Sequence, residues 1–590
     1  MKPLKLTLLW HQHQPYYRAG NRFLLPWAWL HATKDYLEMA QHLERHPKMH
    51  ATINLVPSLI KQIEEYLSGE AVDPVVALMT KPAASLTTAE QDFMLEHFFR
   101  ANEQTMIGKS ERYRELYAKA FEPTTPQPPI ESRASSSKGG GAGFFEQDYR
   151  DLAVHYSLAW TGAIARQSEP FKSLIAKDRG FTEDDKQQLH TAQLRNVREI
   201  FPLHRKLAKR GQIELTTTPF YHPIMPLLID TNVALESMPN ATLPATRFEA
   251  PEEADEQMRR AHAFFKSHIG MNPSGVWPSE GSVSQDTLAL IRKNGFTWTA
   301  TDEGVLKNSI EDETFKVAGQ TIKPEHAKYF PWRGKTSEGP LTIFFRDHRL
   351  SDDIGFTYQS WNAKEAVAHF IGNLHEIRLS LVQEYGEKIL DDACVSVILD
   401  GENCWEYYQN NGFDFLDTLY TELVADKQIA TLTFSEAIEA SSAKHLPILP
   451  RVVAGSWINS NFRIWIGHDE DNAAWDALGR AKESFDQVKL RATKMRGAAK
   501  KEGLARIELA HEELMIAEGS DWCWWYGDDH ANAQKDIFDE LFRMHLRAMY
   551  VHLDLTVPPD LLRGIPSRGE LIVSSATPTT KYGSMHKSDD

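Results

Sequence analysis

The stretch LTLLWHQHQPYY, residues 6–17, places two histidines directly after a short apolar run. Residues i and i+2 of an extended chain lie on the same side, so the imidazoles of His11 and His13 are expected to project together from the end of a buried strand. Pro15 ends this strand because proline has no N–H to donate within a sheet. Such a pair can bind a metal ion, contact a substrate or be two hydrogen-bonded structural histidines.

Short apolar, β-branched runs like this one recur along the chain. Amphipathic stretches such as PSLIKQIEEYL, residues 57–67, separate them. Strands that alternate with helices indicate βαβ units and a parallel sheet, and seven or eight such units favour an α/β barrel. The runs are LKLTLLW (4–10), ATINLV (51–56), QIELTTT (212–218), SGVWPS (274–279), FTWTATD (296–302), LTIFFRD (341–347), CVSVILD (394–400) and IATLTFS (429–435).

Most of these runs end in a polar or acidic residue. In a β/α barrel, the side chains that carry the chemistry gather at the carboxyl ends of the strands. The sequence has neither the G-x-G-x-x-G nor the G-x-x-x-x-G-K-[ST] signature of nucleotide binding. The strand-end residues are His11, His13, Glu214, Glu280, Asp302, Asp347 and Asp400.

The amino-acid composition limits the classes of molecule that the chain is expected to bind. The 590 residues carry a formal charge of −16, which argues against nucleic acid as a partner because binding to a phosphate backbone requires a basic surface. Three cysteines without a C-x-x-C pattern form neither a disulfide framework nor a zinc cluster. No apolar stretch reaches the length of a secretory signal or a membrane span, so we expect a cytoplasmic protein with no membrane partner.

Three further regions differ from the strand-and-helix pattern. Residues 121–143 are rich in Pro, Ser and Gly, and we expect a mobile insertion there within a barrel over residues 1–440. The pattern is helical from about residue 455 to 555, which predicts a helical C-terminal domain over residues 441–567. Residues 568–590 are expected to form a flexible tail.

Two of the strand-end acids stand beside aromatic residues. Glu280 lies in GVWPSEGSVSQDTL, and Asp400 lies in VSVILDGENCWEYYQNNG. A single acid after a strand is more often a turn or N-cap residue. Two such acids with aromatic neighbours match the requirement of glycosidic bond cleavage for one nucleophilic carboxylate and one general acid.

The segments that hold these residues are similar, in order, to the five motif regions of glycoside hydrolase family 57. The closer resemblance is to its amylopullulanase-like and α-amylase-like branch, which two further stretches also resemble, FFRDHRLSDDIGFTY and DWCWWYGDDH. Together they extend from residue 4 to about residue 565. The five regions are HQHQP, GQIELTTTPFYHPIMPLL, GVWPSE, LDGENCWEYY and GSWINSNFRIWIGHDEDNAAW.

This resemblance implies an incomplete (β/α)7 barrel, with the C-terminal domain completing the substrate cleft, and a retaining mechanism on α-glucans without metal or cofactor. Glu280 is the implied nucleophile and Asp400 the implied general acid/base. The charge of Glu280 is expected to raise the pKa of Asp400 and keep it protonated near neutral pH. The implied substrate contacts are His11, His13, Glu214, His222, Asp347, Asp352, Trp405, Trp457, Asn461 and Trp465.

Trp457 and Trp465 are eight residues apart, and on an expected helix they share a face. Asp353 and Cys404 depart from the residues expected at their positions, which affects the inferred linkage preference between α-1,4 and α-1,6 bonds. Neither residue carries the chemistry.

Other functions remain open on the same residues. The same pair of acids serves 4-α-glucanotransferases and branching enzymes, and the outcome depends on how well water is excluded from the intermediate. A different class is a metal-dependent, amidohydrolase-like enzyme that uses His11 and His13 with His222, Asp302 and Asp347 as ligands. A glucan-binding protein without activity is disfavoured because both carboxylates are present. The oligomeric state is left open.

Overall fold

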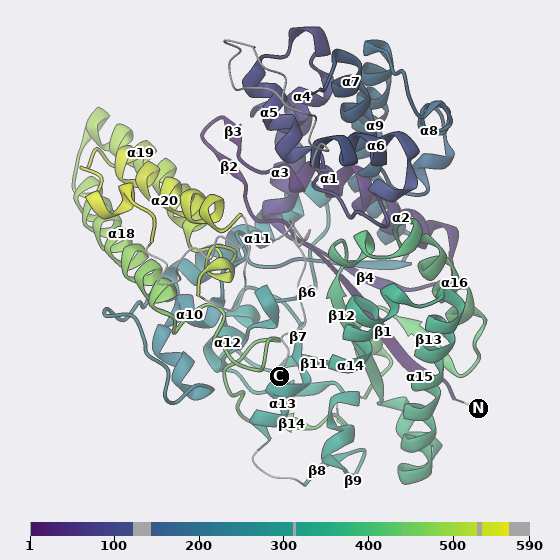
Figure 1. Cartoon of the computed structure of the whole chain (residues 1–590). Helices are drawn as coiled ribbons and strands as arrows, with labels where there is room; N and C mark the ends of the chain where they lie inside the picture. The colour runs from purple at the N-terminus through teal and green to yellow at the C-terminus, as the bar shows by residue number, and fades with distance from the viewer. Residues whose placement is uncertain (1, 122–142, 311–313, 443, 528–533, 566–590) are drawn as a thin grey trace.

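Seven parallel strands form a closed ring at the centre of the molecule (Figure 1). The computed structural model describes residues 2–121, 143–310, 314–442, 444–527 and 534–565. The expected insertion at 121–143, apart from its first and last residues, and the expected tail at 568–590 lie outside these ranges. In order around the ring the strands are β1 (Leu4–Gln12), β4 (Ala51–Leu55), β5 (Ile213–Thr216), β6 (Gly275–Val276), β7 (Trp298–Asp302), β11 (Leu341–Arg346) and β12 (Cys394–Asp400).

Two seams of the ring are thin. A single bridge between Thr217 and Val276 joins β5 to β6. One residue pair, Arg346 with Ser396, joins β11 to β12. The predicted incomplete (β/α)7 barrel is confirmed, and all eight predicted runs contain a strand. The eighth, β13 (Ile429–Leu432), pairs with the first half of β1 outside the ring.

The barrel strands are apolar because helices cover them. All nine residues of β1 are buried. The helices of the barrel and its loops are α1 (Trp27–Lys34), α2 (Tyr36–Arg45), α10 (Met225–Ile229), α11 (Pro251–Ile269), α12 (Gln285–Lys293), α13 (Glu303–Ser309), α14 (His348–Asp352), α15 (Ala363–Tyr385), α16 (Phe413–Ala425) and α17 (Phe434–Glu439). Short strands outside the ring are β2 (Arg18–Ala19), β3 (Arg22–Phe23), β8 (Phe315–Val317), β9 (Gln320–Ile322), β10 (Trp332–Gly334) and β14 (Ile448–Leu449).

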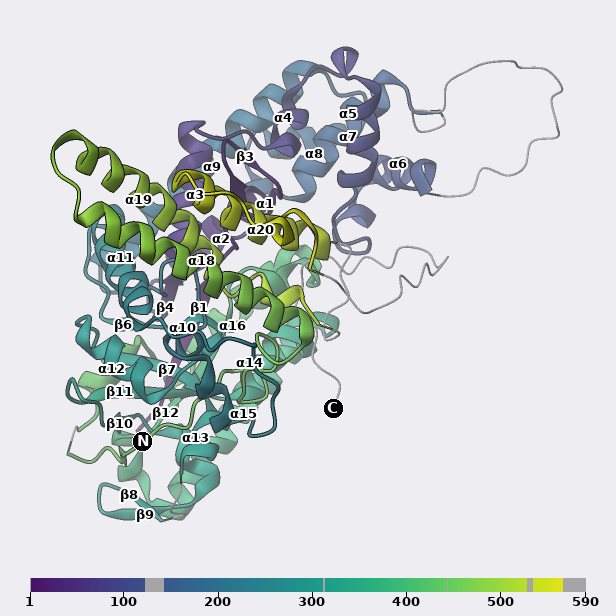
Figure 2. The same cartoon turned by 90° about the vertical axis from the view of Figure 1, so that its left-hand side faces the viewer.

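A long helical excursion separates β4 from β5 and stands at one end of the molecule (Figures 1 and 2). Side-chain caps begin several of its helices: Asp73, Thr87 and Thr182 each accept a hydrogen bond from a backbone N–H of the first turn. Its helices are α3 (Pro57–Ser68), α4 (Pro74–Thr80), α5 (Thr88–His97), α6 (Glu111–Phe121), α7 (Glu146–Ala159), α8 (Phe171–Lys177) and α9 (Glu183–Lys209).

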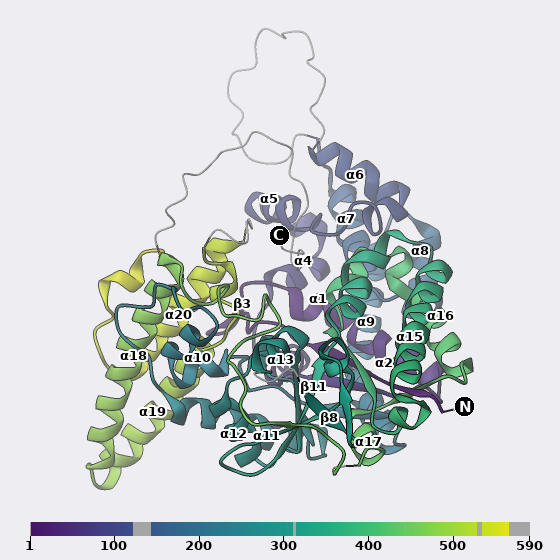
Figure 3. The same ribbon diagram turned by 90° about the horizontal axis from the view of Figure 1, so that it is seen from below.

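The C-terminal helices are α18 (Asp469–Thr493), α19 (Gly497–Ala517) and α20 (Lys535–His552). They lie on the side of the barrel opposite to α15 and α16 (Figure 3). The expectation that Trp457 and Trp465 share a helix face is wrong, because α18 begins only at Asp469. Asn459 and Ser460 have φ values of 49° and 54°, and this left-handed backbone is incompatible with a continuing helix. Within the described ranges, no helix combines the length and apolar character that a bilayer crossing requires.

Candidate active site

A pocket opens at the carboxyl ends of β1 and β12, beside the turn that follows β6. Glu280 and Asp400 both line it, together with His11 and His13. Its wall also contains six aromatic side chains, Tyr17, Trp27, Trp457, Trp524, Trp525 and Phe538, beside further polar residues. The two predicted catalytic carboxylates, which are 120 positions apart in the sequence, therefore share one cavity, as residues at the carboxyl ends of barrel strands do.

Glu280 lies in a strained turn directly after β6. Its φ is 56°, a left-handed conformation that non-glycine residues rarely adopt and that concentrates at functional sites. Trp457 holds this residue at two points: its backbone N donates to the carbonyl oxygen of Glu280 at 2.9 Å, and its indole Nε1 donates to the carboxylate Oε2 at 2.7 Å. These two bonds fix the orientation of the carboxylate. Its other oxygen, Oε1, lies 3.9 Å from His222 Nδ1.

A loop, and not a helix, brings Trp457 to this position. Gly455 and Val283 exchange two backbone hydrogen bonds of 2.8 and 3.0 Å, which attach the loop to the segment that follows Glu280. A Cβ atom on Gly455 would lie 2.5 Å from the carbonyl oxygen of Ser460, so this close approach requires glycine. The turn that interrupts the expected helix is therefore what presents the indole to the carboxylate.

Asp400 ends β12 beside His11 of β1 in the parallel register. The backbone N of the next residue, Gly401, donates to the carbonyl oxygen of His11 at 2.6 Å. The amide Nδ2 of Asn403 donates to the Asp400 carboxylate Oδ2 at 2.9 Å. The first predicted motif and the fourth therefore meet side by side at the mouth of the barrel.

Burial raises the pKa of both carboxyl groups. The negative charges of Asp400 and Asp521 add to this effect at Glu280 and raise its pKa to about 8, against the opposing effect of the Trp457 hydrogen bond. Burial also raises the pKa of Asp400, while the Asn403 amide and the charges of His13 and Arg346 oppose this effect by stabilising its ionised form. The charge of Asp400 thus contributes to the raised pKa of Glu280.

Three imidazoles form a stack beside the pair. The ring centroids of His13 and His222 are 3.8 Å apart, and those of His11 and His222 are 5.3 Å apart. Each ring has a polar partner: His11 contacts Asn54 Oδ1 at 2.7 Å, His13 contacts Asp521 Oδ1 at 2.8 Å, and His222 contacts Ser520 Oγ at 2.9 Å. Burial lowers the pKa of His11 to about 3 and that of His222 well below 6.5, so both rings are neutral at pH 7.

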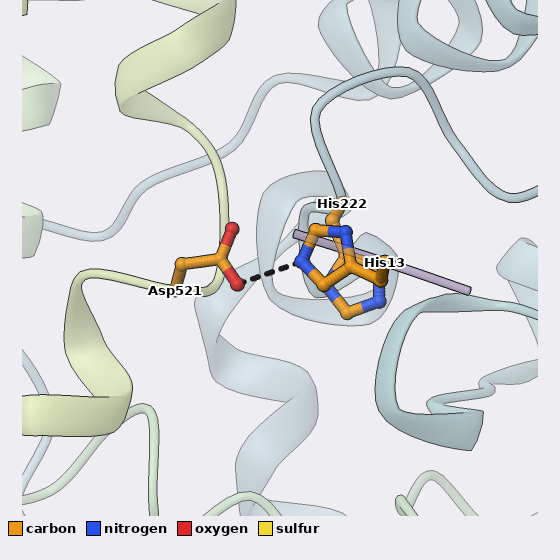
Figure 4. Close-up of side chains that lie close together, drawn as sticks. All are labelled: His13, His222 and Asp521. Carbon is orange, nitrogen blue, oxygen red and sulfur yellow. Dashed lines mark hydrogen bonds and ion pairs between the residues drawn. The ribbon is translucent and has the colours of Figure 1, made fainter. Parts of the chain in front are cut away.

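We tested whether this cluster fits a metal ion. Donor atoms of His13, His222 and Asp521 lie within 4.8 Å of one another (Figure 4). The two rings are stacked with only 16° between their planes. An imidazole nitrogen donates its lone pair within the ring plane, so two stacked rings direct their lone pairs side by side and not to one point. Tetrahedral coordination requires converging donors, and the arrangement does not fit it.

The further ligands of the amidohydrolase-like alternative are also engaged elsewhere. Asp302 pairs with Arg346 at 3.3 Å, and Asp347 pairs with Lys328 at 2.9 Å. These contacts favour a carboxylate-pair site over a metal site.

The sequence matches one enzyme family over most of its length. Residues 7–450 match the family model described as Glycosyl hydrolase family 57. The chain belongs to glycosyl hydrolase family 57. A curated relative, an α-amylase from Pyrococcus furiosus, is 22% identical over 258 residues, which cover 43% of this chain and 32% of that protein. The chain therefore aligns with about a third of the length of that relative.

Solved family 57 structures share the fold across nearly the whole chain. A branching enzyme from Thermococcus kodakaraensis has a TM-score of 0.58 at 15% identity, covering 93% of this chain and 90% of that one. An α-amylase from Thermotoga maritima has a TM-score of 0.56 at 14% identity, covering 94% and 93%. At these identities the similarity shows the fold alone.

Within this family 57 fold, six of the predicted residues lie in the pocket lining or in contact with it. His11, His13, Glu280, Asp400 and Trp457 line it, and His222 stacks on His13 directly behind. Glu214 is not among them. It is the second residue of β5 and lies near the opposite end of the barrel, where it accepts hydrogen bonds from Trp298 Nε1 and from Ser435.

The other five predicted contacts also stand outside the pocket lining. Trp405 is buried against Trp10 and donates its Nε1 to the carbonyl oxygen of Gly401 at 2.8 Å. Trp465 is buried with its ring 5.9 Å from that of Trp524, so it supports the pocket wall from behind. Asp347, Asp352 and Asn461 bind Lys328, Arg346 and the backbone N of Arg463, respectively.

Several pocket residues were not predicted. Asp521, Trp524 and Trp525 come from the loop after α19, within the stretch DWCWWYGDDH, whose dense tryptophans were the available signal. Trp27 and His31 come from α1 and Glu406 from the turn after β12. No local pattern distinguishes these three from core residues, because only the closure of the barrel brings their elements to the pocket.

Proposed function

We propose that this family 57 chain is a retaining glycoside hydrolase that acts on α-glucans, with Glu280 as nucleophile and Asp400 as general acid/base. The observation that carries the proposal is the pair of partly buried carboxylates, one after β6 and one at the end of β12, in a single pocket lined in part by aromatic side chains. Retaining hydrolysis requires two carboxyl groups on either side of the scissile bond.

In the proposed reaction, Asp400 gives its proton to the glycosidic oxygen while Glu280 attacks the anomeric carbon. The C–O bond to the leaving sugar breaks and a covalent glycosyl-enzyme forms. Asp400, now ionised, takes a proton from water, which attacks the anomeric carbon and releases Glu280. An acceptor sugar hydroxyl in place of water gives transglycosylation by the same steps.

The raised pKa of Glu280 sets a condition on substrate binding. Burial and the charge of Asp400 raise this pKa to about 8, so in the free protein at neutral pH the Glu280 carboxyl group is protonated. The reaction needs this proton on Asp400. A leaving oxygen that accepts a hydrogen bond from Asp400 favours the protonated form of that residue, while the Trp457 indole stabilises ionised Glu280. In this proposal, substrate binding therefore favours ionised Glu280 together with protonated Asp400.

The pocket walls suit a sugar chain. The flat, partly apolar faces of pyranose rings pack on aromatic side chains, and Trp27, Trp457, Trp524 and Trp525 supply such surfaces. The neutral imidazoles of His11 and His222 can each donate and accept hydrogen bonds, which suits hydroxyl groups, as does the side chain of His13 beside them. The relatives named an α-amylase and a branching enzyme support α-linked glucose polymers as substrates.

The test is incubation of the purified protein with soluble starch, pullulan and maltoheptaose, followed by measurement of reducing ends and product lengths. New reducing ends from starch indicate hydrolysis, those from maltoheptaose indicate α-1,4 hydrolysis, and maltotriose from pullulan indicates α-1,6 hydrolysis. Redistribution of maltoheptaose lengths without net reducing ends would identify a 4-α-glucanotransferase, and new α-1,6 links in starch a branching enzyme.

The variants E280Q and D400N remove each carboxylate in turn. E214Q is the matched control, because it changes a buried glutamate that also accepts a tryptophan hydrogen bond but lies outside the pocket lining. Activity that persists in E280Q, or that a chelator abolishes, would refute the carboxylate-pair mechanism.

A further inference from the structure

A buried guanidinium lies between the two catalytic segments without being part of the pocket lining. We propose that Arg346 is a positioning residue for the catalytic pair, acting on Glu280 through Trp457 and on Asp400 through β12. This inference rests on the proposed function for its catalytic consequence. Its geometry stands independently, since the Arg346 side chain is only 5% exposed and contacts groups on β7, β12, α14 and the Trp457 loop.

The first connection runs through an indole ring. The Arg346 Cζ atom lies 5.3 Å from the centroid of the Trp457 ring, a cation–π contact in a desolvated setting. The same ring donates Nε1–H to Glu280 Oε2 at 2.7 Å. A cation on the face of an indole withdraws electron density from the ring, which makes its N–H a stronger donor. Arg346 thereby fixes the ring and strengthens its bond to ionised Glu280.

The second connection runs through the strand that carries Asp400. Arg346 Nε donates to the carbonyl oxygen of Ile398 at 2.7 Å, two residues before Asp400. This bond crosses the thin seam between β11 and β12, where a single residue pair joins the strands. The guanidinium therefore supplements the backbone pairing at the point where the position of Asp400 depends on it.

The planar fork of arginine is required for these simultaneous contacts. Nη1 donates to Asp302 Oδ2 at 3.3 Å and Nη2 donates to Asp352 Oδ1 at 2.6 Å, while Nε serves Ile398. Lysine offers one nitrogen on a flexible stem and cannot serve β7, α14 and β12 together. The two aspartates compensate the buried charge, and a second cation, His348, pairs with the same two carboxylates.

The charged groups around the pair define a readout that does not need substrate. Glu280 faces Asp400, Asp521 and His222, and the Trp457 hydrogen bond lowers its pKa. Arg346 lowers the pKa of Asp400 by its charge. Removal of either Arg346 or the Trp457 donor is therefore expected to raise the pH at which the pair loses its last proton.

The experiment measures the carboxyl C=O band by infrared difference spectroscopy, wild type minus E280Q, as a function of pH. In R346M and W457F we expect the titration midpoint to rise by about half a pH unit or more. In R346K, which keeps the charge, we expect kcat on the best α-glucan substrate to fall about tenfold or more with KM little changed, because the pair is misplaced and binding is not.

The matched control is R112M. Arg112 is a partly buried arginine of α6 that also binds two aspartates, Asp151 at 2.9 Å and Asp148 at 2.6 Å, but these belong to α7 and the group lies outside the pocket lining. We expect neither its midpoint nor its kcat to change. If Arg346 only stabilised the fold, R346M and R112M would have the same effects. The R112M control therefore separates a positioning role from general destabilisation.

The outcomes are distinguishable. A wild-type protein without activity on any α-glucan would refute the proposed function, while the infrared titration would still decide whether Arg346 acts on the pair. An unchanged midpoint in both R346M and W457F, or wild-type kcat in R346K, would refute the positioning role. If R346M does not fold, W457F and R346K carry the test, because each keeps a side chain of similar size in place.

Discussion

Two partly buried glutamates near opposite ends of the barrel have the same kind of hydrogen-bond partner and different surroundings. Glu214, near the start of β5, and Glu280, after β6, each accept a hydrogen bond from a tryptophan Nε1, at 2.9 and 2.7 Å. Burial raises the pKa of both. Glu214 is also bound by the backbone and hydroxyl of Ser435, so both of its oxygens are satisfied.

Within the part of the chain that the structure describes, Trp457 is the one hydrogen-bond donor to the Glu280 carboxylate. Its Oε1 lies 3.9 Å from His222 Nδ1, and the charges of Asp400 and Asp521 raise its pKa. The comparison teaches that an indole bond to a buried glutamate does not by itself mark a catalytic group. The position of Glu280 in the pocket lining, and the like charges beside it, distinguish it from Glu214.

The largest expected difference between the two glutamates is in activity. E280Q removes the proposed nucleophile, and we expect kcat/KM on α-glucan to fall by at least about 10²–10⁴-fold. E214Q is expected to remain close to wild type, because Glu214 contacts Trp298 and Ser435 and not the pocket. Initial rates for both variants at equal concentration of folded protein check this. Comparable losses in the two variants would mean that the distinction between them is wrong.

The second expected difference is in the pH dependence of stability. The pKa of Glu280 rises from 4.5 to about 8 on folding, so between these values the folded protein binds a proton more tightly than the unfolded chain. The free energy of unfolding therefore decreases as pH rises through this window, by up to roughly 5 kcal/mol from this group. E280Q removes the contribution.

Urea denaturation at pH 5 and pH 8.5 measures this effect. We expect E280Q to be more stable than wild type at pH 8.5, with a smaller difference at pH 5. Parallel pH profiles for the two proteins would show that Glu280 does not hold a raised pKa. D400N is the informative companion, because loss of the neighbouring charge lowers the pKa of Glu280 and flattens the profile.

The third expected difference is the stability cost of losing a satisfied carboxylate. In E214Q an NH2 group replaces one of the two carboxylate oxygens. One oxygen accepts from Ser435 N, and the other accepts from Trp298 Nε1 and Ser435 Oγ, so the NH2 group meets a donor in either orientation. Two donors then face each other in a buried site, which costs about 1–3 kcal/mol. Thermal unfolding at pH 7 measures this loss. W298F provides the reciprocal test, and an unchanged melting temperature in both would contradict the role of Glu214 in joining β5, β7 and α17.

The same two glutamates show what the sequence could predict and what it could not. The apolar runs predicted all the ring strands, because burial on both faces gives each strand a continuous apolar signal. Both glutamates adjoin such runs, and the sequence placed both at strand ends. Glu214 is in fact the second residue of β5. Sequence composition does not predict where a strand begins, because strand boundaries depend on the pairing partners.

Residues of the pocket lining were predicted where they stand at strand ends and missed where distant loops supply them. His11 and Asp400 are adjacent in the β1–β12 register, so their motifs predicted their meeting. Asp521 reaches His13 from 508 positions away, across a contact that depends on how α19 packs. The predicted helix around Trp457 failed because two left-handed residues, Asn459 and Ser460, are not distinguishable from helix-tolerant ones by sequence periodicity.

The smallest expected effect concerns the backbone that presents Glu280. Gly281 has a φ of 60°, and a Cβ atom there would lie 2.9 Å from Cη2 of the buried Trp277 ring. G281A combines left-handed strain with this clash and is expected to cost about 1–3 kcal/mol of unfolding free energy. The control is G270A at the end of α11, where φ is 80° and a Cβ atom would meet nothing within 4 Å, so only strain of about 1 kcal/mol remains.

These two glycines also separate stability from catalysis. Because Gly281 follows Glu280 in the strained turn, the displacement forced by Trp277 moves the carboxylate away from the Trp457 indole, and kcat is expected to fall in G281A. G270A should lose only stability. Urea denaturation and kcat measured on the same samples decide the point. Full activity in a destabilised G281A would show that the turn tolerates movement, and that Trp457 alone holds the carboxylate in place.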